Sequence, residues 1–148
     1  MKPRPIPDGF HTITPYLIVP NAAQFLEFLE KAFGATVLER VKRPDGTIGH
    51  AQARIGDSML MCGQAYGDWK PEPASLYLYV EDCDAAYDRA IKAGSTSLMA
   101  ITNQFYGDRQ GGVRDPWGNT WWIATRIENV PQEELQRRAD EAMKKRGA

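Results

Sequence analysis

Tyr16-Leu-Ile-Val19 returns 61 residues later as Tyr77-Leu-Tyr-Val80, and this recurrence decides the fold of the chain. Two further segments recur in the same order at nearly the same offset. The pairs are Lys31-Ala-Phe-Gly34 with Lys92-Ala-Gly94, and Gly56-Asp-Ser-Met-Leu-Met61 with Gly118-Asn-Thr-Trp-Trp-Ile123. Such agreement indicates an internal repeat. The alternative, two unrelated α+β stretches, would produce these matches only by chance.

Each copy of the repeat combines one amphipathic helix with four strands. Asn21 and Asp82 are N-cap residues in front of the two helices, and Gly34 and Gly94 stand where a glycine ends a helix. β-branched and aromatic runs predict the strands. They are expected at Thr12–Val19, Thr36–Lys42, Ile48–Ile55, Ser58–Cys62, Leu76–Val80, Thr96–Ile101, Gly112–Arg114 and Thr120–Arg126, with Phe105–Gly112 as a glycine-rich loop.

These elements divide the chain into five segments. They are an extended lead-in (1–10), a first βαβββ unit (11–64), a linker (65–73), a second βαβββ unit (74–128) and a C-terminal helix (129–148). The predicted class is α+β, in which the tandem units form one domain with a curled mixed sheet around a cavity. The last helix has acidic residues first and basic residues last, as its dipole favours.

Composition narrows the function classes. The chain has 148 residues and a net charge of −1, so charge offers no case for binding nucleic acid or an anionic membrane. No apolar run approaches the ~20 residues of a membrane-spanning helix. The first residues lack the apolar stretch of a signal peptide. Cys62 and Cys83 stand alone, which predicts reduced thiols in a cytoplasmic protein.

Several local strings are similar to one family. Tandem βαβββ units resemble the vicinal-oxygen-chelate superfamily, which includes glyoxalase I, bleomycin-resistance proteins, fosfomycin-resistance enzymes and extradiol dioxygenases. The strings resemble its PhnB-like branch from about His11 to Val130. They are His11-Thr-Ile-Thr-Pro-Tyr-Leu17, Lys31-Ala-Phe-Gly-Ala35, Gly49-His-Ala51, Ile55-Gly-Asp-Ser58, Phe105-Tyr-Gly-Asp-Arg109 and Asp115-Pro-Trp-Gly-Asn119.

The resemblance implies where a metal would bind. Relatives that use a metal carry one ligand near the start of the first strand and one on the last strand of each unit. These positions fall on Thr14, Ser75, Trp122 and Leu60, or on Met61 if the register differs by one. Divalent ions prefer carboxylate or imidazole, so we expect no metal at the family position and no other cofactor. A divalent metal held by His50 or His11 with a carboxylate stays open as an alternative.

Strand alternation predicts which side chains line the cavity. Because the resemblance directs Thr14 and Ser75 inward, the aromatic residues Tyr16, Tyr77, Tyr79 and Trp122 should also face inward. In the third strand the polar row His50, Gln52 and Arg54 should line the cavity, with the small residues between them on the helix side. A planar or cationic ligand would suit such a cup. Two alternatives are that the aromatic rings only fill the cup, and that the polar row faces solvent.

The segment Phe105–Arg114 supplies the second candidate site. Its glycines allow close backbone approach, and Arg109 and Arg114 could hold an anion. The alternative is an Asp108–Arg109 pair that only clamps the loop. Cys62 lacks a neighbouring base in the sequence and is expected in the core.

Three functions remain. The first is a metal-free small-molecule-binding protein that sequesters a toxic or antibiotic-like compound. The second is a lyase, isomerase or thiol transferase of the same superfamily, with an atypical metal or with His50, Arg109 or a tyrosine moving protons. The third is a scaffold that binds a partner through the C-terminal helix. We also expect a homodimer, because the strand Thr120–Arg126 is unprotected and carries clustered tryptophans.

Overall fold

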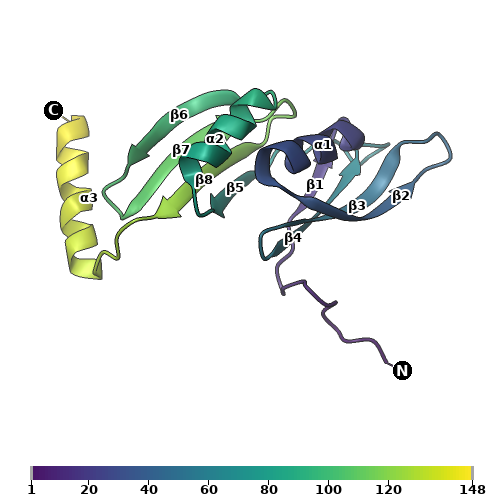
Figure 1. Ribbon diagram of the computed structural model, residues 1–148, viewed down its shortest axis with the longest axis horizontal. Helices are drawn as coiled ribbons and strands as arrows, with labels where there is room; N and C mark the ends of the chain where they lie inside the picture. Colours follow the sequence, from purple (N-terminus) through teal and green to yellow (C-terminus); the bar gives the residue numbers. More distant parts are fainter. Residues whose placement is uncertain (1, 148) are drawn as a thin grey trace.

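The computed structural model describes residues 2–147 and confirms an α+β fold built from two βαβββ units (Figure 1). The first unit contains β1 (Tyr16–Val19), α1 (Ala22–Phe33), β2 (Thr36–Lys42), β3 (Ile48–Ile55) and β4 (Ser58–Gln64). The second contains β5 (Ser75–Tyr79), α2 (Cys83–Lys92), β6 (Thr96–Asn103), β7 (Asp108–Arg114) and β8 (Thr120–Arg126), and is followed by α3 (Gln132–Gly147).

The two units have the same topology but form two separate four-stranded sheets. The strand orders are β1-β4-β3-β2 and β5-β8-β7-β6. In each sheet the first strand of the unit runs parallel to the last, and the other pairs are antiparallel. Each sheet is therefore mixed, as expected, and the predicted curled sheet is divided between the two units. No helix among residues 2–147 is long and apolar enough to cross a membrane.

Strand register corrects one sequence alignment. Tyr16 pairs with Met61 in the first sheet, and Tyr77 pairs with Trp122 in the second. Met61 is therefore the counterpart of Trp122. Leu60 is only 5% exposed and lies in the core on the helix side. The repeated Gly-Asp and Gly-Asn turns suggested that equivalent residues of β4 and β8 are 62 positions apart in the sequence. The backbone pairing shows that they are 61 positions apart, as in β1 and β5.

The helices α1 and α2 begin at their predicted capping residues, and α1 also ends at its predicted glycine, whereas the C-cap of α2 is Ala93, one residue before Gly94. The Asn21 side chain accepts a hydrogen bond from the backbone N–H of Gln24 at 3.1 Å, and the Asp82 side chain does the same for Ala85 at 3.1 Å. Gly34 ends α1 with a φ of 65°, a left-handed conformation that glycine adopts without strain. The buried stripe of α1 then packs on the first sheet.

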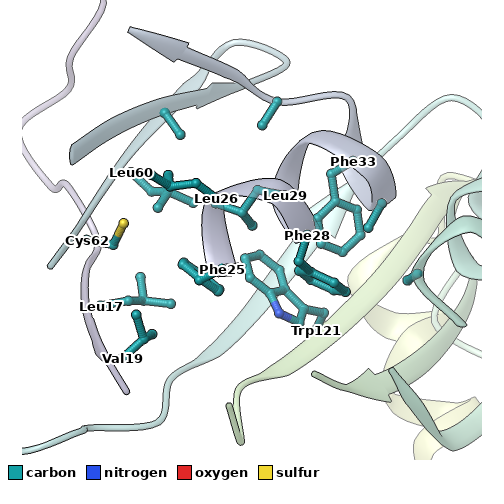
Figure 2. Close-up of a cluster of buried hydrophobic side chains, with 14 of the residues drawn as sticks. Leu17, Val19, Phe25, Leu26, Phe28, Leu29, Phe33, Leu60, Cys62 and Trp121 are labelled. Carbon is teal, nitrogen blue, oxygen red and sulfur yellow. The ribbon is translucent and has the colours of Figure 1, made fainter. Parts of the chain in front are cut away.

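The core continues from one unit into the other through aromatic side chains (Figure 2). Trp121 of β8 is fully buried, and its ring lies 4.9 Å from that of Phe33 at the end of α1. Trp117 contacts Phe25 and Phe28 edge-to-face, at 5.5 and 5.6 Å between centroids. Since α1 also contacts α2, the units are joined on their helix sides.

Four strand boundaries differ from the prediction by two residues or more, and one of them is the end of β4, which lies at Gln64 instead of Cys62. The first strand begins at Tyr16 instead of Thr12, directly after Pro15, which has no N–H to donate to a neighbouring strand. The strand β6 extends to Asn103 instead of ending at Ile101. The predicted loop Phe105–Gly112 is mostly strand, because β7 begins at Asp108.

Glycines in β7 explain that last error. A Cβ on Gly112 would lie 2.5 Å from the Trp122 ring, and one on Gly111 would lie 2.8 Å from the Met99 carbonyl oxygen. These glycines therefore serve close packing inside a sheet. Sequence reasoning treated them as loop residues because glycine usually weakens a strand.

Candidate functional site

The strongest candidate site lies on the face of the second sheet that is turned away from α2. We call it the tyrosine–aspartate face. It consists of Tyr77, Tyr79, Tyr106, Asp108, Gln110, Trp122 and Arg126. Strand alternation creates it, because the neighbouring residues Leu76, Leu78, Val113 and Trp121 pack on the helix side. The face therefore follows from the same alternation that builds the core.

Asp108 is the centre of this face. The residue is 2% exposed, and its Oδ2 accepts hydrogen bonds from the Tyr77 hydroxyl at 2.7 Å and the Tyr79 hydroxyl at 2.8 Å. Its Oδ1 accepts one from the Arg126 guanidinium at 3.1 Å. Burial raises the pKa of the Asp108 carboxyl, but the three hydrogen bonds outweigh burial and hold the pKa below its ordinary value. Asp108 is therefore a carboxylate at neutral pH.

The two phenols bound to Asp108 stay protonated. Burial, followed by the hydrogen bond to Asp108, raises the pKa of Tyr77. For Tyr79 the hydrogen bond to Asp108 is the larger cause of the raised pKa, and burial adds to it. An ionised phenolate could not donate to the carboxylate, so both hydroxyls keep their protons pointed at Oδ2.

Trp122 forms the apolar wall of the face. Its ring packs over Gly112, and its indole N–H donates to the Ser75 hydroxyl at 3.1 Å. A hollow of about 330 Å³ lies beside it. The hollow is lined by Tyr77, Met99, Gln104, Phe105, Tyr106, Gln110 and Trp122, and by Ala142 and Arg146 of α3. The C-terminal helix therefore flanks the site, although none of its residues is buried.

The first sheet carries a smaller polar face. Tyr16 is half exposed, and its hydroxyl lies 3.4 Å from His50 Nδ1, with the two rings stacked at 5.8 Å. Burial raises the pKa of Tyr16, with a smaller contribution from Cys62. Ala51 and Ala53 are buried on the helix side. The row His50, Gln52 and Arg54 thus lies on the face turned away from α1, as alternation predicted.

The structure does not bring the two faces into one cup. They belong to separate sheets, and the 330 Å³ hollow includes none of the four residues of the first face. A second cleft of about 1140 Å³ lies between the units, alongside β5 and the turn between β3 and β4. It is lined by Tyr77 and Tyr79 but likewise by none of Tyr16, His50, Gln52 and Arg54.

Arg109 lies away from both faces. Its guanidinium pairs with Asp84 of α2, through Nε at 2.8 Å and a terminal nitrogen at 2.9 Å, and also donates to Asn103 at 3.0 Å. The alternative Asp108–Arg109 clamp was wrong, whereas the anion-binding role of Arg109 and Arg114 stays a prediction. In a strand the two residues point to opposite faces, so Asp108 pairs with Arg126 and Arg109 ties β7 to α2.

Sequence reasoning missed most of the hydrogen-bonding groups on the tyrosine–aspartate face. Tyr106 donates to Gln110 at 2.7 Å, and both were assigned to a loop together with Asp108. If residues 108–114 had been recognised as a strand, alternation would have placed Asp108 and Gln110 on the same face as Trp122. The two-residue spacing of Asp108, Gln110 and Gly112 was therefore the signal in the sequence that could have revealed these groups.

Asp115 serves structure. Its carboxylate is 4% exposed and accepts hydrogen bonds from the backbone N–H groups of Trp117 and Asn119, the Asn119 amide and the Trp121 indole, all at 2.9–3.0 Å. The Asn119 side-chain oxygen in turn accepts from the backbone N–H of Ala74 at 2.9 Å. The Asp115-Pro-Trp-Gly-Asn119 string is therefore a folding element that anchors β8 and the start of β5.

The residues at the family's metal positions do not fit a divalent ion. Thr14 donates its hydroxyl to the His11 carbonyl at 3.3 Å, and the Ser75 hydroxyl accepts from Trp122. Met61 and Trp122 offer no oxygen or imidazole ligand. Residues 2–147 contain no group of three or more His, Cys, Asp or Glu side chains placed to hold a metal.

Comparison with known proteins agrees with this architecture. An uncharacterised protein of Mycobacterium bovis, Mb0911c, is 36% identical over 135 residues, which cover 84% of this chain and 89% of that protein. The fold is similar to that of TioX from Micromonospora sp. ML1, with a TM-score of 0.68 and 22% identity over 79% of this chain and 99% of TioX. It is also similar to a PhnB protein from Bacillus cereus, with a TM-score of 0.61 and 19% identity over 78% of this chain and 99% of that protein.

A family model supplies the assignment. The model of the Glyoxalase/Bleomycin resistance protein/Dioxygenase superfamily matches residues 9–123, which include both βαβββ units up to the middle of β8. Superfamily membership supports a small-molecule-binding fold. The chain therefore belongs to the Glyoxalase/Bleomycin resistance protein/Dioxygenase superfamily.

Proposed function

We propose that this protein binds a planar small molecule on the tyrosine–aspartate face, without a metal at the family position, and thereby sequesters a toxic or antibiotic-like compound. One observation carries the proposal. Partly exposed aromatic rings surround a buried, fully hydrogen-bonded carboxylate next to a hollow. Rings in such a setting offer stacking surface with a few fixed polar atoms, which is the usual composition of a small-molecule site.

Binding is favoured over catalysis because the reactive groups are already engaged. Asp108 accepts three hydrogen bonds, which leaves it a weak base. Burial raises the pKa of the Cys62 thiol to about 12, so it stays protonated and is a poor nucleophile. We also expect the protein to act in the cytoplasm, where Cys62 and Cys83, both buried and free, stay reduced.

A second candidate function is an enzyme that moves a proton through Tyr16 and His50. The 3.4 Å contact between the Tyr16 hydroxyl and His50 Nδ1 favours it, because a phenol next to an imidazole is a plausible acid–base pair. His50→Asn would abolish such an activity. Under the binding proposal, the same substitution leaves affinity at the tyrosine–aspartate face unchanged.

We further propose a homodimer in which the first-sheet face of one protomer covers the tyrosine–aspartate face of its partner. Both faces carry aromatic and polar groups, and within one chain they belong to separate sheets. Closed two-fold pairs are the commonest oligomers. Sedimentation at micromolar concentration is expected to give twice the mass of the 16.6 kDa chain. A monomer would mean that any ligand is held by one chain.

The test of the binding proposal is a thermal-shift screen of planar compounds, with and without divalent ions, followed by titration of each hit. Trp122→Ala should weaken every hit by at least about fivefold, because removing a stacking ring typically costs on the order of 1–3 kcal/mol. Trp69→Ala is the matched control, since Trp69 lies in the linker and is 71% exposed. Equal affinities in the two variants, or hits that require a divalent ion, would contradict the proposal.

A further inference from the structure

One row of side chains on α3 is turned toward the second sheet, beside whose end the helix stands (Figure 1). Arg138, Ala142 and Arg146 follow one another at intervals of four residues, so they lie on the same side of the helix. The Arg138 guanidinium donates to the Phe105 carbonyl at 3.0 Å, and both Ala142 and Arg146 line the hollow beside Trp122. This row is therefore the part of α3 that contributes to the site.

Arg138 fixes the position of α3. Its guanidinium binds both carboxylate oxygens of Glu128, at 2.8 and 2.9 Å, and one carboxylate oxygen of Glu134 at 3.0 Å. An arginine that binds a carboxylate through two nitrogens has a defined geometry as well as a favourable charge. Because Glu128 lies in the segment between β8 and α3, this pair holds the helix against the end of the second sheet.

Arg146 gives the hollow its charge. Among the residues that the structure describes, no carboxylate lines the hollow, and no hydrogen bond or ion pair engages the Arg146 guanidinium. Arg137 and Arg138, on the same helix, are both paired with glutamates. The nearby Asp108 is 2% exposed, and its carboxylate is paired with Arg126. A ligand in the hollow therefore meets aromatic surface and a positive charge whose N–H donors are free.

We propose that the hollow beside Trp122 selects planar aromatic molecules that carry a carboxylate, with Arg146 of α3 as the counter-ion. This inference rests on the proposed function and names the ligand class of the same site. A guanidinium presents paired N–H donors that match the two oxygens of a carboxylate. The ligand's rings would lie against Trp122 and Phe105, with the carboxylate toward α3. A neutral ligand of the same shape makes only the ring contacts, and a cation is repelled.

The experiment compares three probes of nearly the same shape. They are 2-naphthoate, an anion, 2-naphthamide, which is neutral, and 2-naphthamidinium, a cation. Dissociation constants are measured by titration of ¹H–¹⁵N spectra of the full chain at pH 7, with the indole N–H signal of Trp122 as the reporter. The native protein should bind naphthoate about threefold more tightly than naphthamide, the ratio that an exposed ion pair produces, and should bind naphthamidinium most weakly. In about 1 M sodium chloride the preference should disappear, because salt screens exposed charges.

Two matched variants test whether Arg146 supplies the charge. Arg146→Gln should lower the affinity for naphthoate to that for naphthamide and leave naphthamide unchanged. Lys145→Gln removes an equal charge from the same turn of α3, but Lys145 does not line the hollow, so this variant should keep the preference. Equal binding of naphthoate and naphthamide by the native protein, or equal losses in the two variants, would overturn the inference; the proposed function would stand, because the probes still shift the Trp122 signal. If none of the probes shifts that signal, the inference and the proposed function fail together.

Discussion

Replacing Asp115 with alanine should be among the most destabilising single changes in this protein. The carboxylate of Asp115 accepts four hydrogen bonds, and three of the donors belong to residues that are almost completely buried. These donors are the backbone N–H and side-chain amide of Asn119, which is 1% exposed, and the indole of Trp121, which is fully buried. Alanine leaves all three without a partner and without access to water.

The magnitude follows from the cost of unpaired buried donors. Each such group costs about 1–3 kcal/mol, so three donors with partial relaxation predict a loss of about 4 kcal/mol in the free energy of unfolding. That loss is a large part of the 5–15 kcal/mol that is typical of a domain. The aromatic packing should loosen as well, because Trp117 and Trp121 lie against Phe28 and Phe33 of the first unit.

Urea unfolding, followed by circular dichroism and by tryptophan fluorescence, measures this loss. Asp45→Ala is the control, since Asp45 is an exposed turn residue whose side chain bonds only to Thr47. The free energy of unfolding should fall much less in Asp45→Ala than in Asp115→Ala. If Asp115→Ala were no less stable than the control, or lost less than about 1 kcal/mol, the carboxylate would not be holding this turn together.

Three further results are expected. The pKa of Asp108 is lowered in the folded protein, so the ionised carboxylate contributes to stability above the ordinary pKa of 3.8, and this contribution is lost as the pH falls below 3.8. The difference in unfolding free energy between the native protein and Asp108→Asn should therefore shrink from pH 7 to pH 3. A difference that stays constant over this range would contradict the prediction. Arg109→Ala should lower thermal stability slightly and leave the affinity for every planar ligand unchanged in titrations, since its partner is Asp84 on the helix side; weaker binding would refute that placement. Ellman's reagent should label Cys62 and Cys83 only after unfolding, because both are at most 1% exposed, and rapid labelling of the native protein would show that one of them is accessible.

Local chemistry was sufficient to predict the helices and strands, and to predict for most side chains on which face of the element they lie. Asn21 and Gly34 mark the ends of α1 because capping depends on residues within one turn of the helix. The alternation of His50 with Ala51 assigned the two faces of β3 because side chains in a strand have a period of two. The repeat added the topology, since two copies of one unit bury their cores in the same way.

Tertiary structure decided the strand pairing and the long-range contacts, which capping and alternation do not determine. Only the backbone pairing of β1 with β4 and of β5 with β8 selected Met61 over Leu60 as the counterpart of Trp122. The glycines of β7 are strand residues because the Trp122 ring, ten residues further along, occupies the space of a side chain at Gly112. Asp108 gained two phenols from β5 and a guanidinium from β8 by the same packing. Such contacts join residues that are distant along the chain, so they depend on how whole strands are placed side by side, and local propensity carries no record of that placement.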